Sequence, residues 1–266
     1  MLQRKLIRNP FIGRSLLLLI PAAALSFNVC YSFSGTPARW YHVPVVSAHD
    51  STGKTAADSL ATRSAVATIG LNKHVAGFVK SYLVREEEYL LKMKGKSSRY
   101  FENMETVFLQ HNLPLQLKYL AVVESGLDPK AHSAAGARGL WQLMPVTAQE
   151  LGLKIAGKTD ERLYTHRSTV AAARYLKSLY ALFGDWLLVL AAYNSGPGPV
   201  LTAIKKSGSK NFWALQRFLP AESRGHVKRF IGVHYFFEGQ GSVTTQTKAE
   251  ARAWQNRLCD GELAIR

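Results

Sequence analysis

The chain has 266 residues, 47% of them hydrophobic, and carries 34 Lys and Arg residues against 18 Asp and Glu residues. This length and composition exclude a largely disordered chain, and they allow one sizeable domain with tails or two small domains. The formal net charge of +16 indicates an anionic partner such as a nucleic acid, a membrane surface or an acidic polymer, without choosing among them.

The N-terminus is typical of an export signal. Residues 1–34 contain four basic residues and no acidic one. The apolar run 15–25 has the length of a signal-peptide core and is short for a membrane-spanning helix. An uncleaved anchor that extends this run to Cys30, or acylation of Cys30, is an alternative. We therefore expect residues 1–34 to be a signal peptide or membrane anchor, residues 35–65 to be a flexible linker, and the protein to be exported to the periplasm or cell envelope.

Hydrophobic residues recur at helical spacing from about residue 66 onward. Ser168 and Asp185 each stand before a periodic apolar run, as helix N-caps do. In chain order, the predicted helices include 75–83, 100–111, 145–153, 168–183, 185–193, 199–206, 212–218 and 222–238. Only the stretch 242–247 reads as a short extended piece. The pattern predicts an all-α domain at 66–240 and a C-terminal tail or helix at 241–266.

Glu124 stands on the apolar face of a predicted helix. At spacing i, i+3, i+4 and i+7, the face comprises Leu117, Leu120, Ala121 and Glu124. Burial penalises an ionised carboxylate, so an unpaired one tends to keep its proton. A carboxyl group that is protonated near neutral pH is what protonation of a glycosidic oxygen requires. The alternatives are a pair with Lys or Arg, or a cap at the helix end, which Ser125 and Gly126 close.

A segment poor in large side chains follows at 131–139. Small residues of this kind let a polymer approach the backbone closely. Trp141, Gln142 and Met144 come directly after it and offer an aromatic ring, an amide and a thioether, a combination suited to sugar recognition. The alternative interpretation places Trp141 and Met144 in the core.

A polar turn ends the very apolar segment 186–192. Tyr193 and Asn194 open this turn, where a hydroxyl and an amide can face a cleft. Equally, Asn194 can be a helix C-cap and Tyr193 a core residue, and the residues alone leave both alternatives open.

Three motifs occur in a recognisable order. They are Glu124-Ser125-Gly126 with Pro129, Ala131 and Ser133 behind it, then Gly136-Ala137-x-Gly139-Leu140-Trp141-Gln142-Leu143-Met144-Pro145-x-Thr147-Ala148, and Ala192-Tyr193-Asn194-Ser195-Gly196-x-Gly198. Together they resemble the lytic transglycosylase domain of the soluble-lytic-transglycosylase and goose-lysozyme-like superfamily. Trp141 and the segment 219–224 look like its membrane-bound lytic murein transglycosylase D branch. The resemblance covers about residues 95–240.

The resemblance implies a lysozyme-like, goose-type helical domain with a substrate cleft, in which Glu124 is the catalytic acid and then base. The positions that it marks for substrate binding are Ser133, Gln142, Met144, Tyr193, Asn194 and Glu222. Two features depart from the branch. His226 stands where the branch usually has Tyr, and the wall-binding repeats of the branch have no counterpart in this sequence, so we expect the basic surface to hold the polymer.

For the activity, the resemblance implies non-hydrolytic cleavage of the β-1,4 bond between N-acetylmuramic acid and N-acetylglucosamine in peptidoglycan, which leaves 1,6-anhydro ends. One carboxyl group suffices for this reaction, whereas ordinary glycosidases use two. No metal or cofactor is expected, since His132, His166 and His226 lack metal-ligand spacing. The expected partner is the glycan strand and not a nucleic acid, and we expect a monomer.

Three alternatives compete with this interpretation. A hydrolytic muramidase would need a second carboxylate, for which Asp128, Asp160 and Asp185 are candidates. A non-catalytic wall-binding protein has no use for a protonated, buried acid such as Glu124. A nucleic-acid binder is suggested by charge alone, and the export signal and the lack of any nucleic-acid motif argue against it.

Overall fold

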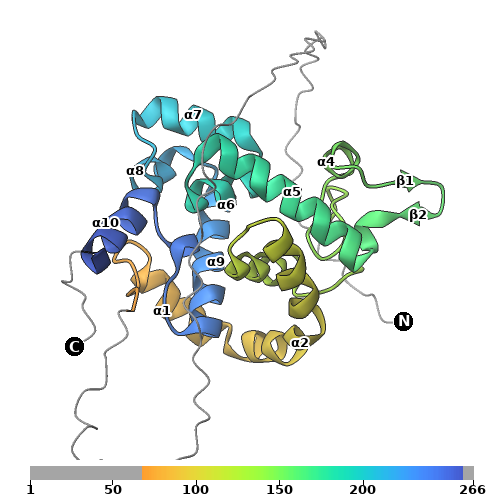
Figure 1. Ribbon diagram of the computed structural model, residues 1–266, viewed down its shortest axis with the longest axis horizontal. Coiled ribbons are helices and arrows are strands. Elements are labelled where there is room, and N and C mark those ends of the chain that lie inside the picture. The colour runs from red at the N-terminus through yellow and green to blue at the C-terminus, as the bar shows by residue number, and fades with distance from the viewer. Residues whose placement is uncertain (1–67, 260–266) are drawn as a thin grey trace, which may run out of the picture. The chain divides into compact units, whose positions relative to one another are not determined.

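The computed structural model describes residues 68–259. The expected signal segment at 1–34 and linker at 35–65 lie outside the described residues. In chain order, the α-helices are α1 Ala76–Arg85, α2 Glu87–Gln110, α3 Tyr119–Ser125, α4 Pro145–Glu150, α5 Thr165–Phe183, α6 Trp186–Ser195, α7 Pro197–Ser207, α8 Phe212–Leu215, α9 Ala221–Glu238 and α10 Lys248–Cys259 (Figure 1). Short 3₁₀ helices are η1 Leu115–Lys118, η2 Glu161–Leu163, η3 Gln216–Phe218 and η4 Val243–Thr245.

The predicted all-α class is confirmed, with one addition. Strands β1 Ile155–Ala156 and β2 Thr159–Asp160 pair antiparallel and form a hairpin, which Figure 1 shows beside α4. Strands of two residues are too short to show an alternating pattern, so no periodicity predicts them. The segment 242–247 is not extended, because it holds η4, which Ser242 caps through its side chain.

The two predicted N-caps have different outcomes. Asp185 caps α6, since its Oδ1 accepts hydrogen bonds from the backbone N–H groups of Leu187 at 3.0 Å and Leu188 at 3.2 Å. Ser168 is not a cap, because α5 already begins at Thr165. Ser168 is buried inside the first turns of α5 and its hydroxyl donates to the backbone oxygen of Thr165. Packing of the earlier turn therefore overrides the local capping signal.

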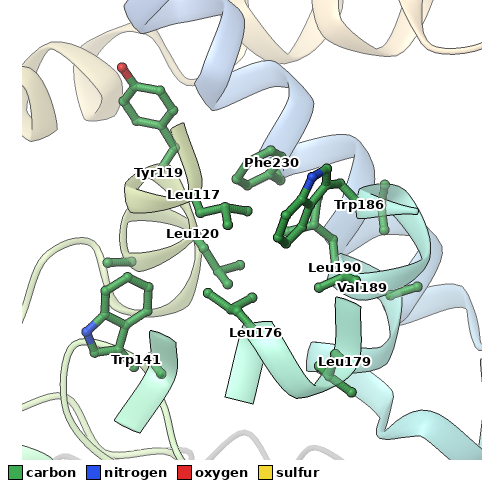
Figure 2. Packing of buried hydrophobic residues seen from close by; sticks show 14 of the residues in the cluster. Leu117, Tyr119, Leu120, Trp141, Leu176, Leu179, Trp186, Val189, Leu190 and Phe230 are labelled. Carbon is green, nitrogen blue, oxygen red and sulfur yellow. The ribbon is translucent and has the colours of Figure 1, made fainter. Parts of the chain in front are cut away.

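The core is built around α6. Each residue from Trp186 to Ala192 is at most 2% exposed, so this helix is enclosed on all sides. It packs against α5, α7 and α9, and α9 in turn packs against α1 and α3. Figure 2 shows Leu117 and Leu120 pointing into the same cluster as Leu176 and Phe230. Burial of such side chains contributes about 1.5–3 kcal/mol each, which stabilises the packing of α3 against α9.

Within residues 68–259, no single helix is long and apolar enough to cross a membrane. The pair α5 and α6 together passes the same test by length and composition, but the two helices are bent by 120° relative to each other.

A buried histidine makes the stability of this core sensitive to pH. The ring of His234 on α9 is fully buried, and its Nε2 lies 2.8 Å from the Ser242 hydroxyl. Burial lowers the pKa of His234 from 6.5 to about 3. Between pH 6.5 and 3, His234 is therefore protonated in the unfolded chain and neutral in the folded chain. The free energy of unfolding falls as the pH drops through this window.

We expect the free energy of unfolding, measured by denaturant titration, to fall by up to ~1.4 kcal/mol per pH unit below pH 6.5 because of His234. His234→Gln should reduce this slope without removing it, since burial also lowers the pKa of His111. The exposed-site variant His132→Gln is the control and should keep the slope. An unchanged slope in His234→Gln would show that another group carries the pH dependence.

Candidate active site

Glu124 lies in the last turn of α3. Two residues later the helix ends at a position that favours glycine. Gly126 follows α3 with a left-handed φ of 60°, as predicted for a helix closed by Ser125 and Gly126. A Cβ at position 126 would also meet the Tyr89 hydroxyl of α2 at 2.9 Å. That hydroxyl donates to the backbone oxygen of Val122 at 3.1 Å, so α2 holds the turn that carries Glu124.

His226 of α9 is the hydrogen-bond partner of Glu124. Its Nε2 lies 2.8 Å from Glu124 Oε1, and the Glu124 side chain is 13% exposed. Glu124 therefore contacts a histidine and no Lys or Arg among the residues of the described range. Its other oxygen, Oε2, has no hydrogen-bond partner within the same range.

The ring of His226 has a preferred tautomer. His226 is 2% exposed, and its Nδ1 is buried without a hydrogen-bond partner among the residues that the structure describes. A hydrogen on Nδ1 would be a buried, unsatisfied donor, which costs more than an unused lone pair. The favoured tautomer thus carries its hydrogen on Nε2, from which it donates to Glu124 Oε1.

Glu124 borders a pocket of about 500 Å³. The wall formed by α2 consists of Tyr89, Lys92, Met93 and Lys96, and the rest of the lining comprises Val123, Glu124, Ser125, Gly126, Asp128, Ala131, His132 and Gln142. Of the predicted site residues, the structure brings Glu124 and Gln142 together at this pocket.

Gln142 is held in an unusual conformation at the pocket. Its φ of 46° is left-handed, which is uncommon for a residue other than glycine and is found where the surroundings impose it. Its Nε2 donates to the backbone oxygen of Gly139 at 2.9 Å and, more weakly, to that of Ala131 at 3.4 Å. The amide therefore ties the two ends of the small-residue loop together beside Glu124.

Arg162 of η2 anchors this loop from behind. It is 4% exposed and donates from Nη1 to the backbone oxygens of Gly136 at 2.8 Å and Leu143 at 3.0 Å. Asp160 balances its charge through Nε and Nη2, and the hydrogen bonds from Arg162 lower the pKa of Asp160. Gly139 must be glycine here, because a Cβ would lie 2.1 Å from the backbone oxygen of Arg162. The loop is thus a fixed wall of the pocket.

Trp141 belongs to the core, which decides between the two interpretations of this residue. Its side chain is fully buried and its Nε1 donates to the Thr169 hydroxyl of α5 at 3.0 Å. Met144 has the opposite outcome, since it is 43% exposed at the start of α4 and is not core. Met144 does not line the pocket beside Glu124.

Tyr193 and Asn194, at the end of α6, are not among the residues that line the pocket. The Tyr193 hydroxyl donates to the backbone oxygen of Trp141 at 2.8 Å. Burial raises the pKa of Tyr193 well above its ordinary value, and the charge of Glu124 raises it further. Asn194 is not a C-cap, because Gly196 ends the helix, and its Oδ1 accepts a hydrogen bond from Ser223 at 2.9 Å.

Ser133 and Glu222 also lie outside the pocket lining. Ser133 Oγ accepts a hydrogen bond from the backbone N–H of Ala137 at 2.9 Å, which shapes the small-residue loop. Glu222 is exposed in the first turn of α9 and makes no hydrogen bond or ion pair with other residues of the 68–259 range. Sequence reasoning missed the α2 wall altogether, although its residues recur at helical spacing.

The three candidates for a second catalytic carboxylate differ in their position and in their partners. Asp128 is exposed and lines the pocket, and its Oδ1 accepts from the backbone N–H of Lys130 at 2.8 Å. Asp160 pairs with Arg162 and Arg138. Asp185 caps α6, also accepts from the backbone of Lys248, and has a pKa raised by burial. Asp128 is the one that the structure places at the pocket with Glu124.

Comparison with known proteins finds similarity to lytic transglycosylases. Residues 109–216 match the Transglycosylase SLT domain family. The chain is 36% identical over 181 residues to membrane-bound lytic murein transglycosylase D of Escherichia coli strain K12, which covers 65% of this chain and 40% of that protein. It is 32% identical over 126 residues to soluble lytic murein transglycosylase of Salmonella typhimurium, covering 44% of this chain and 19% of that protein.

One solved structure bears on the fold. A complex of the 70-kDa soluble lytic transglycosylase with bulgecin A superposes with a TM-score of 0.50 at 22% identity, over 65% of this chain and 32% of that chain. This likeness concerns the helical, lysozyme-like fold alone.

The fold and the pocket define a lysozyme-like helical domain with two carboxyl groups, those of Glu124 and Asp128, at one pocket. Over residues 109–216 the chain is similar to the Transglycosylase SLT domain family, and its relatives include lytic murein transglycosylases. It spans about two fifths of the length of its Escherichia coli relative.

Proposed function

We propose that this chain cleaves the glycan strands of peptidoglycan without water, at the bond between N-acetylmuramic acid and N-acetylglucosamine, with Glu124 as the single acid and base. The observation that carries the proposal is the position of Glu124. Its carboxyl group borders the pocket, has one oxygen held by His226 and has the other without a hydrogen-bond partner among residues 68–259. The names of the relatives, lytic murein transglycosylases, support the same substrate.

The contact with His226 gives the two oxygens of the Glu124 carboxyl group different roles. Because Nε2 of His226 holds Oε1, the proton that Glu124 gives to the bridging oxygen is carried by Oε2. The N-acetyl group of the substrate stabilises the positive charge that develops at C1 as the bond breaks. Oε2 then takes the proton from the C6 hydroxyl, whose oxygen attacks C1 and closes the 1,6-anhydro ring. The carboxyl group ends the cycle protonated, as it began.

We propose supporting roles for the other predicted site residues. Gln142 lines the pocket and contacts the sugar. Tyr193 and Asn194 help to position the segments around the pocket, Tyr193 through its hydrogen bond to Trp141 and Asn194 through its hydrogen bond from Ser223. Ser133, Met144 and Glu222 lie farther out and would meet substrate only where the strand extends beyond the pocket.

A hydrolytic muramidase is the second candidate, and Asp128 is the observation that favours it. This carboxylate lines the same pocket as Glu124 and could activate water. The two candidates differ in their products, since transglycosylation leaves anhydro ends and hydrolysis leaves reducing ends.

We also propose that the protein acts in the cell envelope. The basic and apolar segments within residues 1–34 support export, and the Escherichia coli relative is named membrane-bound. Fractionation of cells that express the full chain tests this proposal, and recovery in the cytosol alone would contradict it.

Glu124→Gln should leave the fold intact and lower the rate of strand cleavage by at least about a hundredfold, because an amide cannot exchange the proton. Mass spectrometry of digested sacculi measures the loss and identifies the ends. Glu102→Gln, an exposed position on α2, is the control and should cleave normally. Anhydro ends support transglycosylation. Reducing ends that disappear in Asp128→Asn would support the muramidase.

His226→Phe should lower kcat about tenfold or more with little change in KM, because the carboxyl group loses the donor that orients it. His226→Gln keeps an N–H group that can reach Oε1 and should recover most of the rate. Thermal unfolding of both variants shows whether the core is intact. A normal kcat in a folded His226→Phe variant would remove His226 from the mechanism.

A further inference from the structure

The α2 wall of the pocket carries two lysines beside the proposed catalytic carboxyl group. Tyr89, Lys92, Met93 and Lys96 stand at i, i+3, i+4 and i+7, so they share one face of α2. Met93 is 2% exposed and fixes this face to the core, while both lysines are exposed and line the pocket. The helix therefore presents two ammonium groups to the space that Glu124 borders.

Neither lysine has its charge neutralised by the protein. Among residues 68–259, Lys92 and Lys96 form no ion pair and no hydrogen bond. Other lysines nearby are engaged, since Lys118 pairs with Glu105 and Lys94 lies over the Phe236 ring.

Within residues 68–259, the two acids of the pocket form no ion pair with either lysine. Glu124 contacts His226, and Asp128 accepts from the backbone N–H of Lys130. Two unpaired cations therefore remain at a pocket wall, positioned for an anion that arrives with the substrate.

We propose that Lys92 and Lys96 bind the carboxylates of the peptide stems that the glycan strand carries. This inference rests on the proposed function, because it requires a peptidoglycan strand beside Glu124. The sugar whose C1 reacts is the one that bears a stem, so stem carboxylates reach the pocket wall. Ammonium groups on long, flexible side chains suit carboxylates whose positions vary along a strand. The lysines would thus select strands with stems over bare glycan.

The test compares soluble glycan strands that carry stems with the same strands stripped of stems by an amidase. Binding is measured to the purified full chain with Glu124→Gln, so that strands are not consumed. Lys92→Gln combined with Lys96→Gln removes the pair. Lys94→Gln combined with Arg99→Gln is the matched control, because it removes the same charge from the same helix outside the pocket lining.

We expect the pair variant to bind stem-bearing strands about three- to tenfold more weakly and bare strands as before. The control should keep the preference for stems, and added salt should weaken that preference in the parent protein. The inference would be overturned if the pair variant lost the same binding affinity for both kinds of strand, or if the control variant lost as much as the pair variant. Either result would point to a general attraction between the positive charge of the protein and the polymer. The protein with Glu124 intact is tested for cleavage of the same strands. If it cleaves none of them while the lysines still bind the stems, the proposed catalysis fails and the proposed binding of stems stands.

Discussion

The hydrogen bond between Glu124 and His226 is the contact on which the rest of the site depends. It joins α3 to α9 across 102 positions of sequence, so it exists only if both helices are placed correctly. Leu117 of η1 and Leu120 of α3 fix this end of α3 through the core, and Phe230 fixes α9 in the same cluster (Figure 2). The apolar core is therefore what positions the one polar contact that organises the carboxyl group, and loosening that packing would misplace it.

The two walls of the pocket are held by different means. The loop wall is poor in side chains and is fixed by polar contacts, chiefly those that Arg162 makes to the backbone at Gly136 and Leu143. The α2 wall is a regular helix fixed by Met93, with its lysines left exposed. A rigid backbone wall suits recognition of a repeating sugar, whereas long charged side chains suit stems of variable position. This division fits the proposed substrate, a polymer with a uniform backbone and charged branches.

Much of the fold could be predicted from local patterns. The helical periodicity, the Asp185 cap and the closure of α3 by Gly126 each depend on a few neighbouring residues, and the structure bears them out. The Ser168 cap was wrong because packing extends α5 to Thr165, and the β1–β2 hairpin was too short to leave a pattern. For Trp141, periodicity alone could not distinguish core from cleft. Its full burial and its hydrogen bond to Thr169 show that it belongs to the core.

The order of the residues was enough to predict the helical class, the apolar face that carries Glu124 and the motifs that resemble a lytic transglycosylase domain, because these follow from spacing along one chain segment. The folded arrangement was needed to find that His226 is the partner of Glu124, that Asp128 alone of the three candidate acids reaches the pocket, and that α2 supplies a lysine-bearing wall. These facts are distances between segments far apart in sequence. Such distances are set by how the helices pack against one another, which no local pattern records.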